Sequence, residues 1–543
     1  DRSLVRQDDA ERYSLHPLLR QYAAEKLAAH PAEEATTRGR HLRLYLGFLN
    51  EKEAALAGAQ AREGLDEIRA ELANVRAAWE WGVAQQAIDA LGQSIPTLAQ
   101  FYNRAGLFRE GQAVFGSAAE RLFGASLPPG APAPGAPAPM SLLARLRLEQ
   151  ARFLFGLGEY ARIPEHARAA ITLAAACHDS SIEAQAELIR GYLHHNRGEL
   201  LLAQDCYARA LNLSRTENPE GGLPARRNRL EVEANSLNGL AMVAKRQGRY
   251  DEAERYLEQS LQAAREADDL AGQCRALNGL GTVVSRRGDL SQALAHYQEA
   301  LDAALACGDR ALEGALLNNL GNVHLHLGLY DEAGIYYEQA LQIQREIGAR
   351  AKEISASFNL GLVHHYQGDQ ETARTRFQQA LTLAEAMGHR RAQAFAWLGT
   401  GHALLSLQAL NEAREAYQRA IALRRELDQA HLTAEPLAGL ARVCLAQGDL
   451  GQAQSHVEEL LDHLASGETF ADAVSPFQVY LTCYRVLVTN QDPRAQGLLD
   501  TAHELLQEQA AKITDEKLRR SFLENVAAHR ELAQAFKRTG EAH

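Results

Sequence analysis

The residues in this sequence whose types and spacing could do chemistry are paired histidines. Histidine nitrogens are frequent ligands of transition metals, so a metal site is the first hypothesis. The pairs are His194-His195, His324-x-His326 and His364-His365. No catalytic motif accompanies them, because the chain has no HExxH, no GxSxG and no Gly followed by Lys, as a phosphate-binding loop would require. The sequence therefore predicts that this chain is not an enzyme and does not bind ATP by such a loop.

Small residues recur in the sequence with a fixed spacing, which is 40 residues from Ala241 to Gly281 and at each step as far as Ala441. Twelve residues after most of them comes an alanine, and four positions later usually an aromatic residue. A period in this range indicates stacked helical hairpins, and a small residue lets two helices cross closely. The series predicts ten hairpins, at Ala99, Ala151, Gly191, Ala241, Gly281, Gly321, Gly361, Gly401, Ala441 and Cys483.

This pattern resembles the tetratricopeptide repeat (TPR), whose small, alanine and aromatic positions it reproduces. Leu320-Gly321-Asn322 and Asn359-Leu360-Gly361 are close to the signature of that family. The resemblance implies an all-α, right-handed superhelical solenoid. The usual repeat has about 34 residues, so the helices here are expected to be longer. Within this pattern, His194, His324 and His364 take the place of a packing tyrosine, which favours half-buried, hydrogen-bonded rings over metal ligands.

TPR superhelices bind protein or peptide in a concave groove lined by the first helix of each hairpin. With the small residue as position 8, positions 2, 5, 9, 12 and 13 point into the groove, and we call the residues at these positions the inner face. An asparagine side chain can both donate hydrogen bonds to a peptide backbone and accept them from it, and arginine binds carboxylates. The face therefore suits an extended peptide or an acidic surface. A solvated surface is the alternative for any one residue. The predicted binding residues are Asn235, Asn238, Lys245, Arg246, Arg275, Asn278, Arg286, Asn318, Asn322, His326, His365 and Tyr366.

Composition limits the classes of partner. The net charge of -12 and the isoelectric point near 6.0 argue against nucleic acid. The six cysteines lie far apart with no CxxC, which favours reduced thiols and a cytoplasmic protein. No apolar run approaches the roughly 18 residues of a membrane span, so no membrane partner is expected.

Phrases near both ends resemble signal-transduction ATPases with numerous domains (STAND, NB-ARC-like). Leu15-His16-Pro17 and the following helix are similar to the end of their winged-helix domain, and Leu65–Trp79 to the helix that links it to a TPR sensor. Phe522–Val526 is similar to their carboxyl terminus. The resemblance implies that His16 senses nucleotide in a full-length protein only, although Pro17 replaces the family's Asp. It also implies an upstream effector and an ATPase domain that would bind ATP or ADP and Mg.

The expected organisation follows from the repeat and from this resemblance. The segments are the end of a winged-helix domain at 1–30, a helical linker at 31–90, a TPR superhelix at 91–510 and a capping helix at 511–543. A non-helical linker rich in Pro and Ala is expected at 128–139, and an insertion between repeats is expected at 216–230. The leading hypothesis is a ligand-sensing, autoinhibitory domain that contacts an upstream ATPase in cis. The alternative is a free-standing TPR scaffold or adaptor that tethers protein partners.

Overall fold

Helices form most of the structure, a computed structural model that describes residues 5–7, 13–15, 17–57, 60–124, 137–216, 223–466, 469–470 and 473–540. The chain divides into two units. Unit 1 comprises Asp1–Gln247, Gln259–Gly272 and Ala306–Gly308, and unit 2 comprises Gly248–Glu258, Gln273–Leu305 and Asp309–His543.

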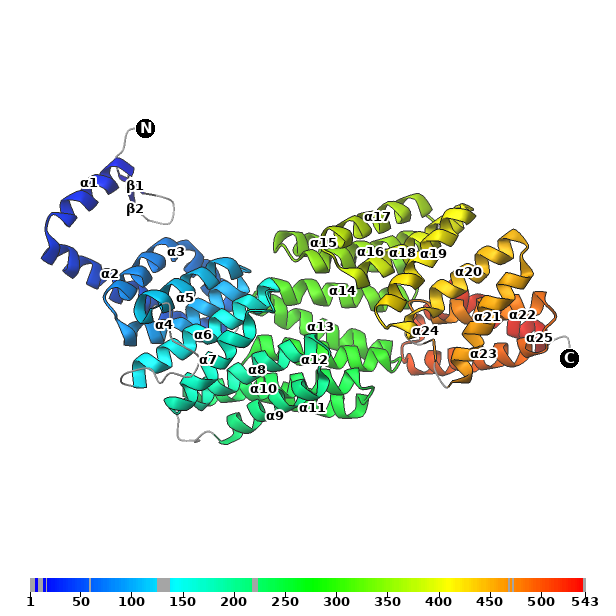
Figure 1. The fold of residues 1–543 in the computed structure, drawn as a ribbon, viewed down its shortest axis with the longest axis horizontal. Coiled ribbons are helices and arrows are strands. Elements are labelled where there is room, and N and C mark those ends of the chain that lie inside the picture. The colour runs from blue at the N-terminus through cyan, green and yellow to red at the C-terminus, as the bar shows by residue number, and fades with distance from the viewer. Residues whose placement is uncertain are drawn as a thin grey trace. The chain divides into compact units, whose positions relative to one another are not determined.

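Unit 1 contains one short antiparallel pair of strands and ten whole helices (Figure 1). They are β1 (Val5–Gln7), β2 (Tyr13–Leu15), α1 (Pro17–Ala28), α2 (Pro31–Ala57), α3 (Ala61–Ala84), α4 (Ile88–Arg104), α5 (Phe108–Phe123), α6 (Pro137–Leu157), α7 (Ile163–Ala176), α8 (Ser180–Asn196), α9 (Leu200–Thr216) and α10 (Leu223–Arg246). Three further helices have residues in both units: α11 (Tyr250–Glu266), α12 (Leu270–Arg286) and α13 (Leu290–Cys307).

Unit 2 contains the remaining helices. They are α14 (Arg310–His326), α15 (Tyr330–Glu346), α16 (Arg350–Gln367), α17 (Gln370–Ala386), α18 (Arg390–Ser406), α19 (Leu410–Glu426), the 3-10 helix η1 (Ala430–Leu432), α20 (Ala434–Gln447), α21 (Leu450–Ala465), α22 (Pro476–Thr489), α23 (Arg494–Lys512), α24 (Glu516–Glu524) and α25 (Ala527–Gly540). The ten predicted hairpins are confirmed as the successive helix pairs from α4–α5 to α22–α23.

The small residues of the repeat do what their spacing predicts. An ideal Cβ on Gly321 of α14 would lie 2.6 Å from the ring of Tyr337 on α15, and one on Gly281 would lie 2.7 Å from Tyr297. Both rings are almost completely buried. The two helices of a pair can therefore approach this closely only because the first one lacks a side chain at the crossing point.

Local sequence also sets where the helices end and begin. Gly368 and Gly448 end α16 and α20 with φ angles of 90° and 77°, a left-handed conformation that glycine adopts at low cost. Asp369 and Asp449 follow them, and their side chains accept hydrogen bonds from backbone N–H groups in the first turns of α17 and α21. The Gly-Asp pairs thus stop one helix and start the next.

Both predicted insertions are shorter than the sequence indicated. Helix α6 begins at Pro137, so the prediction of non-helical structure was wrong for residues 137–139, and α10 begins at Leu223, inside the predicted insertion. Proline is tolerated in the first turn of a helix, because the N–H groups there have no acceptor within the helix.

The segment predicted as a helical linker, 31–90, is a helical hairpin that belongs to the core of unit 1. Leu46 of α2 and Ile68 of α3 are buried in the same hydrophobic cluster as the residues of α4 to α8. Trp79 of α3 meets Phe115 of α5 edge to face, with ring centroids 5.3 Å apart. Helices α2 and α3 therefore extend the packed array toward the amino terminus.

The predicted capping helix at the carboxyl terminus is two helices, α24 and α25, which separate at Asn525 and Val526. The Ser521 hydroxyl donates a hydrogen bond to the carbonyl oxygen of Leu327 (2.7 Å), and the Asn525 amide donates to that of Gly328 (3.4 Å). The end of the chain consequently packs on the turn between α14 and α15 (Figure 1).

Candidate functional site

A ladder of asparagine amides joins the inner face of unit 2 to Asn319 and Asn359, at position 6, across the first helices of three successive hairpins. The Asn319 amide donates to Asn278 Oδ1 (2.8 Å), which joins α14 to α12. The Asn359 amide donates to Asn318 Oδ1 (3.0 Å) and to Asn322 Oδ1 (3.2 Å), which joins α16 to α14. Because Asn278 and Asn318 use their oxygens as acceptors here, their N–H donors point to the remaining partners or to solvent.

Aromatic residues of the second helices reach position 9 of this face with their hydroxyl groups. The pairs are Tyr297 with Thr282 (3.3 Å), Tyr337 with Asn322 (2.8 Å), and Tyr417 with His402 (2.9 Å). Each hydroxyl group extends past the small residue at position 8 and forms a hydrogen bond with the side chain at position 9. The tyrosines of the second helices therefore hold these inner-face side chains in position.

These hydroxyl contacts predict a difference between two otherwise similar substitutions. Tyr337→Phe is expected to lower the free energy of unfolding by about 1 kcal/mol, since the bond to Asn322 is lost. Tyr207→Phe is expected to be neutral or stabilising, since the buried Tyr207 hydroxyl has no hydrogen-bond partner among the described residues. Urea denaturation of both variants, followed by circular dichroism, checks this, and equal losses would contradict it.

A buried polar cluster continues the inner face from α16 to α20. The rings of His365 and His402 stack with centroids 5.7 Å apart, and His402 Nε2 lies 3.3 Å from Glu435 Oε1. His402 and Glu435 are buried, whereas His365 is half-buried. Burial, reinforced by His402 and Arg442, lowers the pKa of His365 to about 4. His365 is therefore neutral near neutral pH.

A non-helical segment that precedes α22 lies on this cluster. The main-chain N–H of Val474 donates to Glu435 Oε2 (2.7 Å), and the hydroxyl groups of Ser475 and Tyr366 are 2.5 Å apart. The side chain of Val474 packs against the hydrophobic cluster of α14 to α18. Tyr366 in turn stacks on Tyr330, with centroids 5.4 Å apart. The inner face of unit 2 thus binds a stretch of its own chain.

The predicted cations of unit 2 lie at the start of this face. Arg275 is half-buried, and Arg286 and His326 are exposed. Partial desolvation, together with the charge of Arg286, lowers the pKa of His326. Arg286 therefore supplies positive charge to this end of the face and disfavours the protonated form of His326.

Four predicted residues belong to unit 1. The Asn235 amide donates to the carbonyl oxygen of Glu231 in its own helix (2.8 Å), and Asn238 is half-buried. Arg246 donates to the carbonyl oxygen of His195 (2.9 Å). The pKa of His195 is lowered by burial and by the charges of Arg246 and Lys245. The predicted set is thus divided between the units.

The structure adds two residues to the face. Counted from Ala441 and Gly401, Glu435 is at position 2 and His402 at position 9, so the same count would have found both. Ser475 lies outside the repeat, and no periodic signal marks it. His16, predicted as a nucleotide sensor, lies outside the described residues.

The paired histidines are explained by local contacts. His194 Nδ1 lies 2.5 Å from Glu199, and His324 Nδ1 lies 2.8 Å from the carbonyl oxygen of Leu320. Within the described residues, no group of three or more His, Cys, Asp or Glu is arranged to hold a metal ion. No helix in this part of the chain is both long and apolar enough to cross a membrane. All six cysteines are free thiols.

Comparison with known proteins identifies the repeats. The tetratricopeptide-repeat family model matches residues 232–306, 312–386 and 393–466, so these stretches are TPR repeats, which are suited to protein–protein interaction. No curated protein sequence matches the chain.

The solved structures that resemble this chain include the following three. The apo quorum sensor NprR from B. thuringiensis has a TM-score of 0.48 at 14% identity, over 67% of this chain and 97% of that one. A STAND protein with a TPR sensor from Pyrococcus horikoshii has a TM-score of 0.45 at 17% identity, over 66% of this chain and 54% of that one. A Rap protein complexed with Competence and Sporulation Factor has a TM-score of 0.44 at 16% identity, over 67% of this chain and 100% of that one.

Proposed function

We propose that the inner face binds an extended segment of a protein or peptide, and that the chain is the ligand-sensing, autoinhibitory part of a STAND signalling ATPase. One observation carries the binding part: the segment at Val474 and Ser475 bonds to Glu435 and Tyr366 through a main-chain N–H and a hydroxyl. The same face can receive a partner segment by the same kinds of contact.

The chemistry beside this segment supports an extended polypeptide as the ligand. Such a chain presents alternating N–H and C=O groups, and asparagine amides can bond to either. The ladder at Asn278 and Asn318 offers these amides at regular intervals along successive helices. Arg275 and Arg286 add positive charge in an acidic protein, which favours a ligand with carboxylates.

The signalling part of the proposal is supported by sequence resemblance alone. Leu15-His16-Pro17 and Leu65–Trp79 resemble the region that joins ATPase and sensor in STAND regulators. In this proposal the sensor contacts an upstream ATPase domain in cis, in the cytoplasm, and ligand binding releases it. ATP or ADP with Mg would bind to that upstream domain, and the present chain acts by binding and not by catalysis.

The reading frame upstream of Asp1 tests the signalling part. We expect it to encode a Gly-Lys-Ser/Thr loop within an ATPase domain, preceded by an effector. A native start codon within a few residues of Asp1 would contradict a STAND sensor. The free-standing scaffold would then be the better description.

Peptides selected from a random linear library test the binding part. Arg275→Glu combined with Arg286→Glu is expected to lower the affinity for the selected peptides by about tenfold or more, because two favourable charges become unfavourable. If the double variant does not fold, Arg286→Glu alone can be measured instead, because Arg286 is exposed. Arg350→Glu is the control, since Arg350 is exposed and outside the inner face. Unchanged affinity in the double variant would place the binding site elsewhere.

A further inference from the structure

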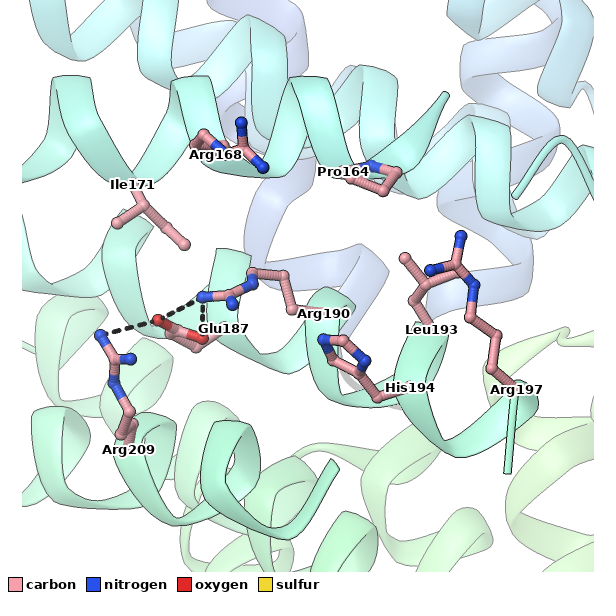
Figure 2. A pocket seen from close by; sticks show the side chains of 9 residues that line it. All are labelled: Pro164, Arg168, Ile171, Glu187, Arg190, Leu193, His194, Arg197 and Arg209. Atoms are coloured by element: carbon pink, nitrogen blue, oxygen red, sulfur yellow. Dashed lines mark hydrogen bonds and ion pairs between the residues drawn. The ribbon is translucent and has the colours of Figure 1, made fainter. Parts of the chain in front are cut away.

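A pocket of about 270 Å³ lies in unit 1 between α7, α8 and α9, away from the inner face (Figure 2). Four of its lining residues are arginines, and its one acidic lining residue is Glu187. A ligand of this pocket would be independent of the function proposed above for the inner face. In a chain of net charge -12, this local excess of positive charge requires an explanation.

Glu187 orders two of the arginines. Its side chain has no exposed surface, and both of its oxygens lie 3.0 Å from Arg190 Nη1. Arg209 Nη2, from α9, lies 3.0 Å from Glu187 Oε1. A buried carboxylate must be paired, so these contacts hold two guanidinium groups in place at the wall of the pocket. Each guanidinium has five N–H donors and keeps some of them for a ligand.

The other two arginines are not neutralised in this way. Within the described part of the chain, no carboxylate pairs with Arg168 of α7 or with Arg197 at the end of α8. Glu199 bonds to His194 at the edge of the pocket and does not line it. Four arginines and one glutamate leave three positive charges in excess around the cavity. Like charges that line one cavity repel each other, and a bound anion would relieve that repulsion.

The directions of approach indicate the shape of the anion. Arg168 lies on the α7 side of the pocket, opposite Arg190, and Arg197 lies toward one end (Figure 2). A tetrahedral anion presents oxygens in several directions, whereas a carboxylate presents them in one plane. The α7 side also contributes the apolar side chains of Pro164 and Ile171, which suit a short organic group.

We infer that this pocket binds a small phosphate monoester, with Arg168, Arg190 and Arg197 around the phosphate. Arg209 acts through Glu187 and holds Arg190 in position. Arginine is the side chain best matched to phosphate, because its planar fork donates two parallel hydrogen bonds. The small volume and the apolar wall favour a free metabolite over a nucleic-acid strand.

Calorimetric titration of the full chain with glycerol 3-phosphate, inorganic phosphate and succinate tests this inference. Both phosphates are expected to bind, and succinate, which carries the same charge on planar carboxylates, is expected to bind at least about tenfold more weakly. A bound phosphate should also raise the melting temperature. No binding of glycerol 3-phosphate at millimolar concentration, or equal binding of succinate, would overturn the inference.

Substitution locates the site. Arg168→Gln with Arg197→Gln changes two exposed side chains and is expected to weaken glycerol 3-phosphate binding by about tenfold or more for each arginine. Arg121→Gln, on the exposed surface of α5, is the matched control and should leave binding unchanged. If the double variant fails to fold, binding is measured with each single Gln variant instead. Wild-type affinity in the folded Arg168 and Arg197 variants would overturn the inference.

Discussion

Replacing Phe377 by alanine is expected to lower the free energy of unfolding by about 3–5 kcal/mol, because no neighbouring side chain can fill the space of the ring. Phe377 on α17 has no exposed surface, and it lies between two glycines, Gly361 of α16 and Gly399 of α18. A Cβ on Gly361 would lie 2.5 Å from the ring. Since neither glycine has a side chain that could move, alanine would leave a cavity between two hairpins.

A matched variant keeps the ring and tests the hydrogen bond at position 9. Phe377→Tyr would bury a hydroxyl beside Leu362, where the corresponding tyrosine of the preceding hairpin bonds to Asn322. We expect this variant to lose about 1–3 kcal/mol, since the hydroxyl has no partner. Adding Leu362→Asn should recover part of that loss. Urea denaturation measures all three variants, and a small effect of Phe377→Ala or no recovery would contradict this account.

The repeat could be predicted because its determinants are local. A glycine at the crossing point and a ring sixteen residues later, as in Gly321 and Tyr337, are both required for one helix pair to pack, so they recur at a fixed spacing. The inner-face asparagines follow from the same count, because side chains at fixed positions of equivalent helices share one face.

Contacts between distant segments could not be predicted in this way. Val474 and Ser475 reach Glu435 and Tyr366 from a segment outside the repeat, and Ser521 bonds to Leu327 across 194 residues of sequence. Such contacts depend on how the array curves and not on periodicity. The sequence predicts only a linker at helices α2 and α3, because the small residues that α3 buries, such as Gly64 and Gly82, do not continue the 40-residue spacing.

The pocket at Glu187 also had no signal in the sequence. Its arginines come from three helices and are separated by up to 41 residues, as for Arg168 and Arg209, and isolated arginines are common on helix surfaces. Only the fold brings them around one pocket. The inner face could be predicted because its residues recur at fixed positions of the repeat. The pocket could not be predicted because its arginines do not.

Acidification is expected to destabilise unit 2, and two histidines with lowered pKa values give the reason. Burial lowers the pKa of His529 on α25 to about 4, and the charge of the nearby His326 acts in the same direction. The hydrogen bond between His529 Nδ1 and the Phe522 carbonyl oxygen (2.7 Å) opposes this shift only partly. His365, which faces His402 and Arg442, also has a pKa of about 4. Both rings are therefore neutral in the folded state.

The sign of the effect follows from these values. The unfolded chain binds protons at its histidines below about pH 6.5, whereas folded His529 binds one only near pH 4, so stability is lost as the pH falls between these values. For His529, which is 7% exposed, the loss between pH 6.5 and 5 is about 2 kcal/mol. His365 acts in the same direction with a smaller effect, because water partly screens its half-buried ring.

Urea denaturation at pH 7, 6 and 5 measures this loss, and His529→Gln separates it from the other histidines. A glutamine amide can donate to the Phe522 carbonyl oxygen but does not titrate, so the variant should be less stable than the wild type at pH 7 and should lose less on acidification. The protection of amides in α24 and α25 against hydrogen exchange, relative to the intrinsic rate at each pH, should fall between pH 7 and pH 5, because His529 bonds to Phe522 and Ser521 holds α24 on Leu327. The same dependence on pH in the wild type and the variant would mean that folding does not lower the pKa of His529.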